Sequence, residues 1–358
     1  MNDTLQLEQL ALPATPDSDD ASDFRALVEL NNTVCRNDAG TDDLAQTPAE
    51  LLAGLRDTAD AVQRIFIIRE AGALVGAITV GHATAEPTSS QIDLMVLPEN
   101  WGRGIEDALL ARAEEETRIL GRKVMQTWTL HPGHAEGPTI TPATGWGVVA
   151  DTALSRLLSN SGFTLEQVER NSAFDLQGSM NGVRTAFEAS RVAAGSDYRL
   201  VEWTIPTPPE LKEGYAWALS RMSTDVPAGA LEIDEEIWDA ARVERREARL
   251  IEGGQTMSVA AALHVPTGRL AAFNELVIDA DRTAVTHQYC TLVLQEHRGH
   301  SLGMLVKCAN LLRWRDVAPD SPRVSTFNAE ENRRMLDINE QIGFTPVSYA
   351  GAWQKKLV

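Results

Sequence analysis

An apolar run that ends in a short basic turn is the part of the sequence that most directly indicates chemistry. The run ends in Leu292, Val293 and Leu294, and the turn that leads into a helical pattern contains Arg298, Gly299, His300, Ser301, Leu302 and Gly303. The N-terminus of a helix offers unpaired N–H groups and a positive dipole end, which attract phosphate. Small residues also let a ligand approach the backbone. The turn therefore predicts a phosphate or pyrophosphate site, with a plain tight connector as the alternative.

Two asparagines after the next expected strand favour the binding interpretation. Asn328 ends the strand that begins near Val324, and Asn332 lies one turn into the following helix. The chemistry is thus expected in the second half of the sequence.

The elements that must position these residues follow one order twice. Apolar and β-branched runs alternate with helical patterns, which predicts an α/β class with mixed sheets. Sliding the halves by 197 residues places Trp101 and Gly102 on Arg298 and Gly299. A Pro/Gly-rich stretch over 131–147 accounts for the extra length of the first half. We infer an internal duplication, with domains 1–177 and 197–358 joined by a helical connector over 178–196.

In its basic turn and its internal repeat, the chain resembles the GCN5-related N-acetyltransferase (GNAT) superfamily. It is most similar to tandem, two-domain actinobacterial members of the mycothiol-synthase-like type. The resemblance implies two tandem GNAT folds, each a central, mostly antiparallel mixed sheet with splayed middle strands flanked by helices. It also implies acetyl-CoA as co-substrate, direct acyl transfer to the amine of a small molecule, and no metal.

The resemblance assigns a role to each residue of the turn region. Backbone groups of residues 292–294 would pair with the pantetheine arm of the cofactor, and residues 298–303 would hold its pyrophosphate. Ser301 stands where the family signature has a glycine, and its hydroxyl could cap the helix. Asn328 and Asn332 match positions that line the pantetheine and thiol region.

The first half departs from the same signature. Trp101 replaces the basic residue, and Glu106 stands where the last small residue would be. A carboxylate there would face the pyrophosphate charge at a cost of roughly 1 kcal/mol or more. We therefore expect a degenerate, structural first domain and a cofactor-binding second domain, with weak binding in both as the alternative.

Acyl transfer to an amine needs a base, and the leaving thiolate can use an acid. In the mycothiol-synthase-like pattern the base position corresponds to His287. Strand alternation places His287, Tyr289 and Thr291 on one face, and Glu275 is expected opposite position 286 or 287. Glu275, His287 and Tyr289 are therefore the candidate catalytic residues, with a solvated or satisfied surface position as the alternative. The usual tyrosine acid is missing, since its position holds Asn339.

Composition limits the remaining possibilities. The chain has 51 Asp and Glu against 32 Lys and Arg, a net charge of -19. This charge would repel nucleic acid and anionic membranes, and it mildly favours a cationic amine. Three separated cysteines and no signal-like N-terminus predict a cytoplasmic protein, either monomer or homodimer. A catalytically silent CoA-binding scaffold is the alternative to an enzyme.

Overall fold

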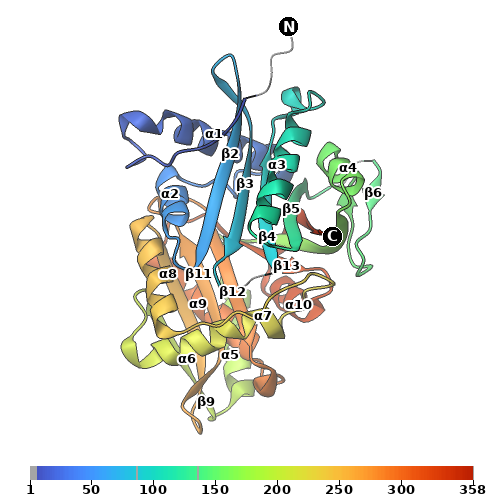
Figure 1. Cartoon of the computed structure of the whole chain (residues 1–358). Helices are drawn as coiled ribbons and strands as arrows, with labels where there is room; N and C mark the ends of the chain where they lie inside the picture. The colour runs from blue at the N-terminus through green and yellow to red at the C-terminus, as the bar shows by residue number, and fades with distance from the viewer. Residues whose placement is uncertain (1–5, 86–87, 135–136, 358) are drawn as a thin grey trace. The chain divides into compact units, whose positions relative to one another are not determined.

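The computed structural model describes residues 6–85, 88–134 and 137–357, and the chain divides into two compact units (Figure 1). Unit 1 consists of Met1–Glu169, Ala228–Asp234 and Ser348–Val358, and unit 2 of Arg170–Pro227 and Glu235–Val347. The predicted domains are continuous stretches of sequence, whereas residues 228–234 and 348–358 fold with unit 1. The expected connector helix belongs wholly to unit 2.

The sheet of unit 1 begins with a meander of antiparallel strands. Its strands are β1 (Gln6–Gln9), β2 (Ala61–Glu70), β3 (Ala73–Ala83), β4 (Ser89–Met95) and β5 (Val124–Pro132). Neighbours β4 and β5 are parallel and pair only from Ser89 to Gln91, after which the two strands separate. Strand β14 (Thr345–Lys356) returns to unit 1 and pairs antiparallel with β5 from Ser348 to Lys356.

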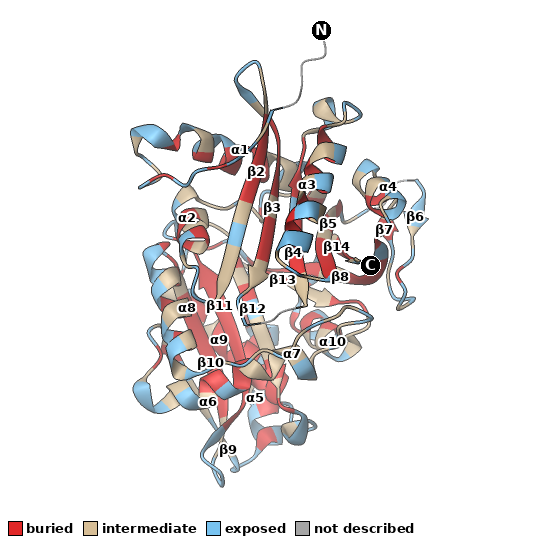
Figure 2. Cartoon of the chain, viewed as in Figure 1, coloured by how far each residue is buried: buried red, intermediate tan, exposed pale blue. Residues whose placement is uncertain are grey.

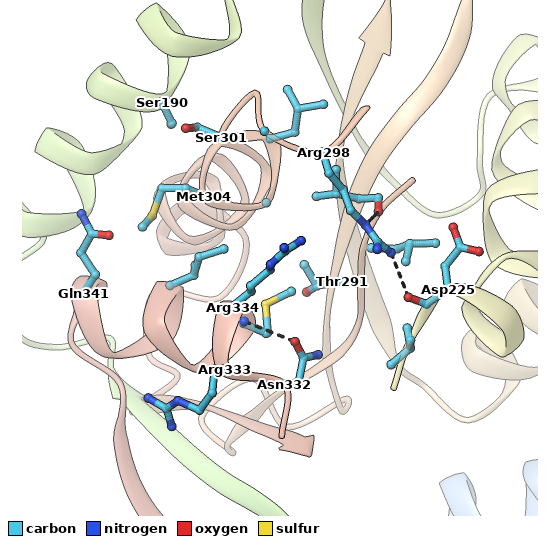
Figure 3. Close-up of a pocket in the computed structure, with 18 of the residues that line it drawn as sticks. Ser190, Asp225, Thr291, Arg298, Ser301, Met304, Asn332, Arg333, Arg334 and Gln341 are labelled. Atoms are coloured by element: carbon cyan, nitrogen blue, oxygen red, sulfur yellow. Dashed lines mark hydrogen bonds between the residues drawn. The ribbon is translucent and has the colours of Figure 1, made fainter. Parts of the chain in front are cut away.

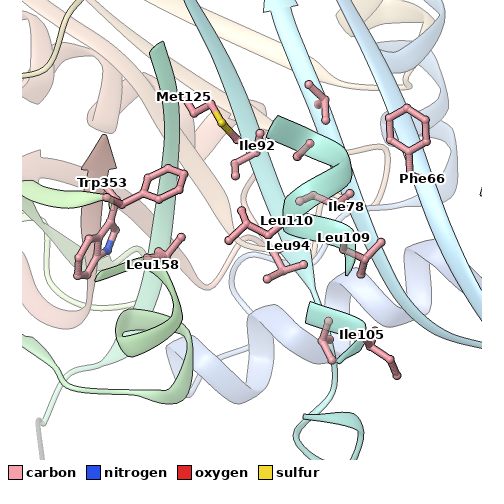
Figure 4. Close-up of a cluster of buried hydrophobic side chains, with 14 of the residues drawn as sticks. Phe66, Ile78, Ile92, Leu94, Ile105, Leu109, Leu110, Met125, Leu158 and Trp353 are labelled. Carbon is pink, nitrogen blue, oxygen red and sulfur yellow. The ribbon is translucent and has the colours of Figure 1, made fainter. Parts of the chain in front are cut away.

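Helices cover both faces of this sheet. The helices of unit 1 are α1 (Ser22–Ala39), α2 (Pro48–Arg56), α3 (Ile105–Ile119) and α4 (Ala153–Asn160). Figure 4 shows Leu109 and Leu110 of α3 packed with Ile78 and Leu94 of the strands. On the other face Phe24 of α1 belongs to a second buried cluster. On each face of the sheet, the apolar residues that alternate along the strands pack against the apolar stripe of a helix and form one core.

Unit 2 repeats the arrangement. Its strands are β9 (Tyr198–Thr204), β10 (Thr256–His264), β11 (Arg269–Ile278), β12 (Thr286–Val293) and β13 (Arg323–Ala329). The first four pair antiparallel in the order β9-β10-β11-β12. Parallel pairing of β12 with β13 involves only Thr286 and His287, so these middle strands separate beyond His287. The expected splay is confirmed.

Five helices of unit 2 matter for the site. They are α5 (Asn181–Ala194), α6 (Pro209–Ser220), α8 (Ala240–Glu252), α9 (Leu302–Val317) and α10 (Arg333–Ile342). Tyr215 of α6 and Val243 of α8 pack with Phe273 on one face of the sheet, whereas Leu305 of α9 packs with Ala271 on the other. Figure 2 shows the resulting burial of β10 and β11.

Several expected elements have different limits. The sequence before Leu176 predicts two short strands, but this stretch forms one strand, β8 (Thr164–Asp175). The end of the chain likewise predicts a pair of strands and forms the single strand β14. Helix α2 was not predicted, although Thr47 and Glu50 form a capping box at its start. The 131–147 stretch contains β6 (Thr139–Ile140), and its residues 135–136 lie outside the described part.

Candidate active site

Unit 2 contains a cavity of about 1000 Å³ at the open end of the splayed strands (Figure 3). Its walls are the end of β12, the basic turn, the first turns of α9 and α10, one face of α5, and the residues around the end of α7 (Met222–Asp225). The lining includes Ala186, Ala189, Ser190, Ala193, Asp225, Thr291, Leu292, Val293, Arg298, Gly299, Ser301, Leu302, Gly303, Met304, Asn332, Arg334, Met335 and Ile338. A cavity of this size can hold a large cofactor.

The turn forms an open backbone cradle. Gly299 has φ +93°, and a Cβ atom there would meet nothing within 4 Å. Ser301 also adopts a left-handed conformation, with φ 56°, which costs a non-glycine residue roughly 1–2 kcal/mol. Its side chain makes no capping hydrogen bond, so the N–H groups in the first turn of α9 have no cap from Ser301. This strained, uncapped helix start fits an anionic group such as pyrophosphate.

The predicted cofactor residues divide into two groups. Leu292 and Val293 line the cavity, as do all the turn residues except His300. The backbone N–H of Leu294 donates to Ala271 (3.0 Å), and its carbonyl accepts from His297 (2.9 Å). Both backbone groups of Leu294 thus already have a hydrogen bond within the protein.

The basic residues of the turn have specific protein partners. Arg298 donates to the carbonyl oxygens of Asp225 (2.9 Å) and Val293 (3.3 Å), joining the turn to the residue at the end of α7. The ring of His300 lies 5.2 Å from that of Tyr198, away from the cavity lining. His300 therefore lies outside the cavity lining, whereas Arg298 lines the cavity with two of its donors bound to backbone carbonyls.

The two asparagines have different positions. Asn332 lines the cavity and caps α10 by accepting from the N–H of Met335 (3.4 Å). Asn328 instead accepts from Nδ2 of Asn339 (2.7 Å) and is not part of the lining. Figure 3 shows Arg334 extending from α10 into the cavity toward Thr291, a basic group that the sequence did not single out.

Helix α5 also contributes a wall that the sequence interpretation missed. Ala186, Ala189, Ser190 and Ala193 line the cavity, and Ala194 packs against the start of α9. These small residues recur at helical spacing on one face, which is a signal for close approach rather than for a free connector. The alanine content of this helix alone does not predict the wall, whereas the spacing of its small residues does.

Glu275 is held in a buried ion pair. Its side chain is 0% exposed and accepts from both terminal nitrogens of Arg246 (2.9 and 2.6 Å), from Tyr215 Oη and from the N–H of Cys290 (3.4 Å). Burial alone would raise the pKa of Glu275, but the Arg246 charge and these hydrogen bonds lower it. A carboxylate in this state is a poor proton acceptor at neutral pH.

A bulge in β12 corrects the predicted register. Val277, not Glu275, lies opposite His287, and the pairing shifts between Asn274 and Leu276. Thr291 pairs with Asn274, whose side chain donates to it (2.8 Å), on the α9 face. His287 pairs with Val277 of the α6/α8 cluster, so His287 and Thr291 do not share a face as alternation had predicted. Bulges reverse this phase and are common beside active sites.

The equivalent place in unit 1 is filled by the protein itself. The N–H of Gly102 donates to Glu106 Oε1 (2.7 Å), and the indole N–H of Trp101 donates to the carbonyl of Val96 (2.9 Å). The cavity next to Trp101 measures about 240 Å³. A carboxylate thus occupies a turn amide in unit 1, whereas the carbonyl of Val96 accepts from Trp101 just as that of Val293 accepts from Arg298 in unit 2.

The fold is shared with known acetyltransferase structures. No family model and no curated protein matches the sequence. A tandem GNAT protein from the clavulanic acid biosynthesis pathway matches with 22% identity and TM-score 0.74 over 98% of both chains. The chain has the tandem GNAT fold. A GCN5-related N-acetyltransferase from Sphaerobacter thermophilus is also similar, with 14% identity and TM-score 0.61 over 99% of this chain and 96% of its own.

A third match lies within a larger protein. The GCN5-related glucosamine N-acetyltransferase region of a fungal multi-domain GH3 β-N-acetylglucosaminidase is 15% identical, with TM-score 0.58 over 98% of this chain and 38% of that one. Within the described residues, no cluster of three or more His, Cys, Asp or Glu is arranged to hold a metal. No helix in the same part of the chain has the length and apolar character to cross a membrane.

Proposed function

We propose that the protein is an acetyl-CoA-dependent N-acetyltransferase that acts on the amine of a small molecule, with its active site in unit 2. The observation that carries the proposal is the open cradle of residues 298–303 at the end of a cavity of about 1000 Å³. The pyrophosphate would bind the cradle, and the pantetheine arm would run along Thr291 to Val293. Acetyl-CoA supplies the activated thioester.

The contrast between the units supports one cofactor per chain. In unit 1 Glu106 accepts from the turn amide of Gly102. In unit 2 the first turn of α9 has no such internal ligand from Ser301. We therefore assign unit 1 a structural role.

His287 and Tyr289 are the proposed proton-transfer groups. Tyr289 is 42% exposed and His287 is part-buried, so both side chains are accessible, and an imidazole is a common general base. Glu275 has a different role in the proposal. Its carboxylate accepts a hydrogen bond from the backbone N–H of Cys290 and so holds the bulge in place. Burial raises the pKa of the Cys290 thiol, which makes an acyl-cysteine intermediate unsuitable.

The test is release of coenzyme A across a panel of small amines, followed with a thiol reagent. Cationic amines such as polyamines and amino sugars should come first, because the net charge of -19 would attract them. His287→Ala should lower kcat by about 10²–10⁴-fold with little change in acetyl-CoA affinity. Glu275→Gln should instead lower stability.

The competing function is a CoA-binding scaffold, which would bind acetyl-CoA without release for any amine. Binding without release would therefore replace the enzyme proposal, and full activity in both His287→Ala and Tyr289→Phe would remove these two residues from it. The acetyltransferase neighbours do not favour the scaffold.

A further inference from the structure

A lysine is buried next to the cavity and has no part in the function proposed above. Lys307 lies one turn beyond Gly303 on α9 and is 0% exposed. Its ammonium donates to Asn339 Oδ1 and lies 5.2 Å from the ring centre of Phe344. Nδ2 of Asn339 in turn donates to Asn328. Each of these partners is neutral.

Among the residues that the structure describes, the charge of Lys307 has no counterion. Lys307 forms no ion pair with residues 6–85, 88–134 or 137–357. Burial lowers its pKa to about 7, and the nearby Cys308 thiol opposes this shift. Burying an ammonium group without an anion costs free energy, so buried lysines are usually paired with a negative charge.

The side chain of Met335 connects this ammonium to the wall of the cavity. The sulfur of Met335 lies 3.9 Å from Nζ of Lys307, and Met335 lines the cavity. Ile338, the residue before Asn339 on α10, lines it as well. A Met335 side chain is flexible and apolar, and it does little to screen a charge behind it.

Lys307 is also level with the stretch of β12 along which the arm would lie. A Cβ on Gly303 would be 3.4 Å from the side chain of Val293. Three residues beyond Lys307, Asn310 donates to Asn274 (2.8 Å), the partner of Thr291. Lys307 therefore lies between the levels of Val293 and Thr291, past the pyrophosphate cradle.

We propose that the buried ammonium of Lys307 stabilises the thiolate of coenzyme A as the acyl group leaves. The inference rests on the proposed function. Beyond the pyrophosphate the arm of coenzyme A is uncharged up to its sulfur, so the sulfur is the one atom there on which negative charge can develop. Because Met335 stands between the ammonium and the cavity, Lys307 acts through space as a positioning residue and does not touch the substrate.

The reaction step balances without a further reagent. The neutral amine forms the new C–N bond to the acyl carbon, the C–S bond breaks, and its electron pair leaves on sulfur. The proton lost by the amine passes through the base to water, and the thiolate takes a proton from water on release. Lys307 contributes its field to the leaving step.

The test compares coenzyme A with desulfo-coenzyme A, which lacks only the sulfur, by calorimetry on the full chain at neutral pH. Lys307→Met removes the charge in a side chain of similar shape, and Lys307→Gln keeps a hydrogen-bond donor without the charge. Lys212→Met is the matched control, because Lys212 is paired with Glu244 at the surface of the same unit. Ultraviolet absorbance reports thiolate in the bound ligand.

The unchanged protein and Lys212→Met should bind coenzyme A about tenfold more tightly than desulfo-coenzyme A and show bound thiolate. Both Lys307 variants should lose this preference and the thiolate signal while their affinity for desulfo-coenzyme A stays the same. An unchanged preference in Lys307→Met and Lys307→Gln contradicts the role of Lys307 alone. If the unchanged protein binds neither ligand, the proposed function fails and this inference fails with it.

Discussion

At the scale of single residues, Lys307 gives the free energy of unfolding a defined pH dependence. Its pKa is about 7 in the fold and near 10.5 in an exposed lysine. Between these values the unfolded chain binds more protons than the folded one, so stability rises with pH across this window. Below pH 7 both states are protonated, and the burial cost is present in full.

Lys307→Met should therefore be more stable than the unchanged protein below pH 7. The advantage should shrink by at most about 1.4 kcal/mol per pH unit above pH 7 and vanish near pH 10.5. Urea unfolding of both proteins at several pH values measures the difference, which cancels the titration of cysteines and tyrosines common to both. A constant difference over this range would mean that Lys307 does not titrate there.

Some residue roles could be predicted from the sequence, and others could not. The conflict between Glu106 and a phosphate followed from charge and position alone, and Glu106 indeed bonds its own turn. The ion pair of Glu275 with Arg246 did not follow, since it joins a strand to a helix nearly 30 residues earlier in the chain. The bulge in β12 has no glycine or other marker in the sequence, so the register error at His287 came from assuming a regular ladder.

At the scale of elements, the two strand–turn–helix junctions are alternative versions of one device. Glu106 and Gly303 hold equivalent positions in the repeat. One supplies an internal carboxylate to the turn, and the other leaves the turn open. A single side chain therefore distinguishes a closed junction from an open one.

Gly303→Glu should abolish acetyl-CoA binding by placing a carboxylate in the cradle of unit 2. Its Cβ would lie 3.2 Å from Ile338, so Gly303→Ala is needed to separate crowding from charge. Glu106→Gly in unit 1 is the reciprocal variant and should leave turnover and the one-to-one binding stoichiometry unchanged. Calorimetry gives the affinity and the stoichiometry of acetyl-CoA binding, and release of coenzyme A gives turnover. Retained binding in Gly303→Glu would rule out this turn as the anion site.

Elements with strong periodicity were predicted well, whereas their packing partners were not. In the hairpins β2–β3 and β10–β11 apolar strands flank short Gly-containing turns, a pattern that predicts a hairpin from sequence alone. Helix α5 was located correctly but taken for a connector, because sequence shows which face is small without showing what approaches it. The cavity wall formed by Arg334 and the residues around the end of α7 had no periodic signal.

At the scale of the whole molecule, the chain path interleaves the two units. Residues 348–358 complete unit 1, where Trp353 is 1% exposed and donates to Thr129 (3.0 Å). Residues 228–234 also fold with unit 1, where Asp234 accepts from the N–H and hydroxyl of Thr88 (3.0 and 2.6 Å). A cut between the sequence repeats would therefore remove a core strand from unit 1.

Trp353→Ala should destabilise unit 1 by roughly 3–5 kcal/mol, since it empties a large core position. Hydrogen exchange should become faster in β5 and α3 and change little in β10 and β11. Trp217→Ala is the matched control, because Trp217 is 39% exposed in unit 2. Equal acceleration in both units would contradict the assignment of the last strand to unit 1.

The return of β14 to unit 1 also sets an order of events during protein synthesis. About 180 residues separate Glu169 from Ser348, which at about 5–20 residues per second take roughly 10–40 s to translate. Throughout that time the edge of β5 that β14 will cover is without its partner strand. The repeat made first is thus the one completed last, and the nascent chain must keep that edge from pairing elsewhere while unit 2 is still being made.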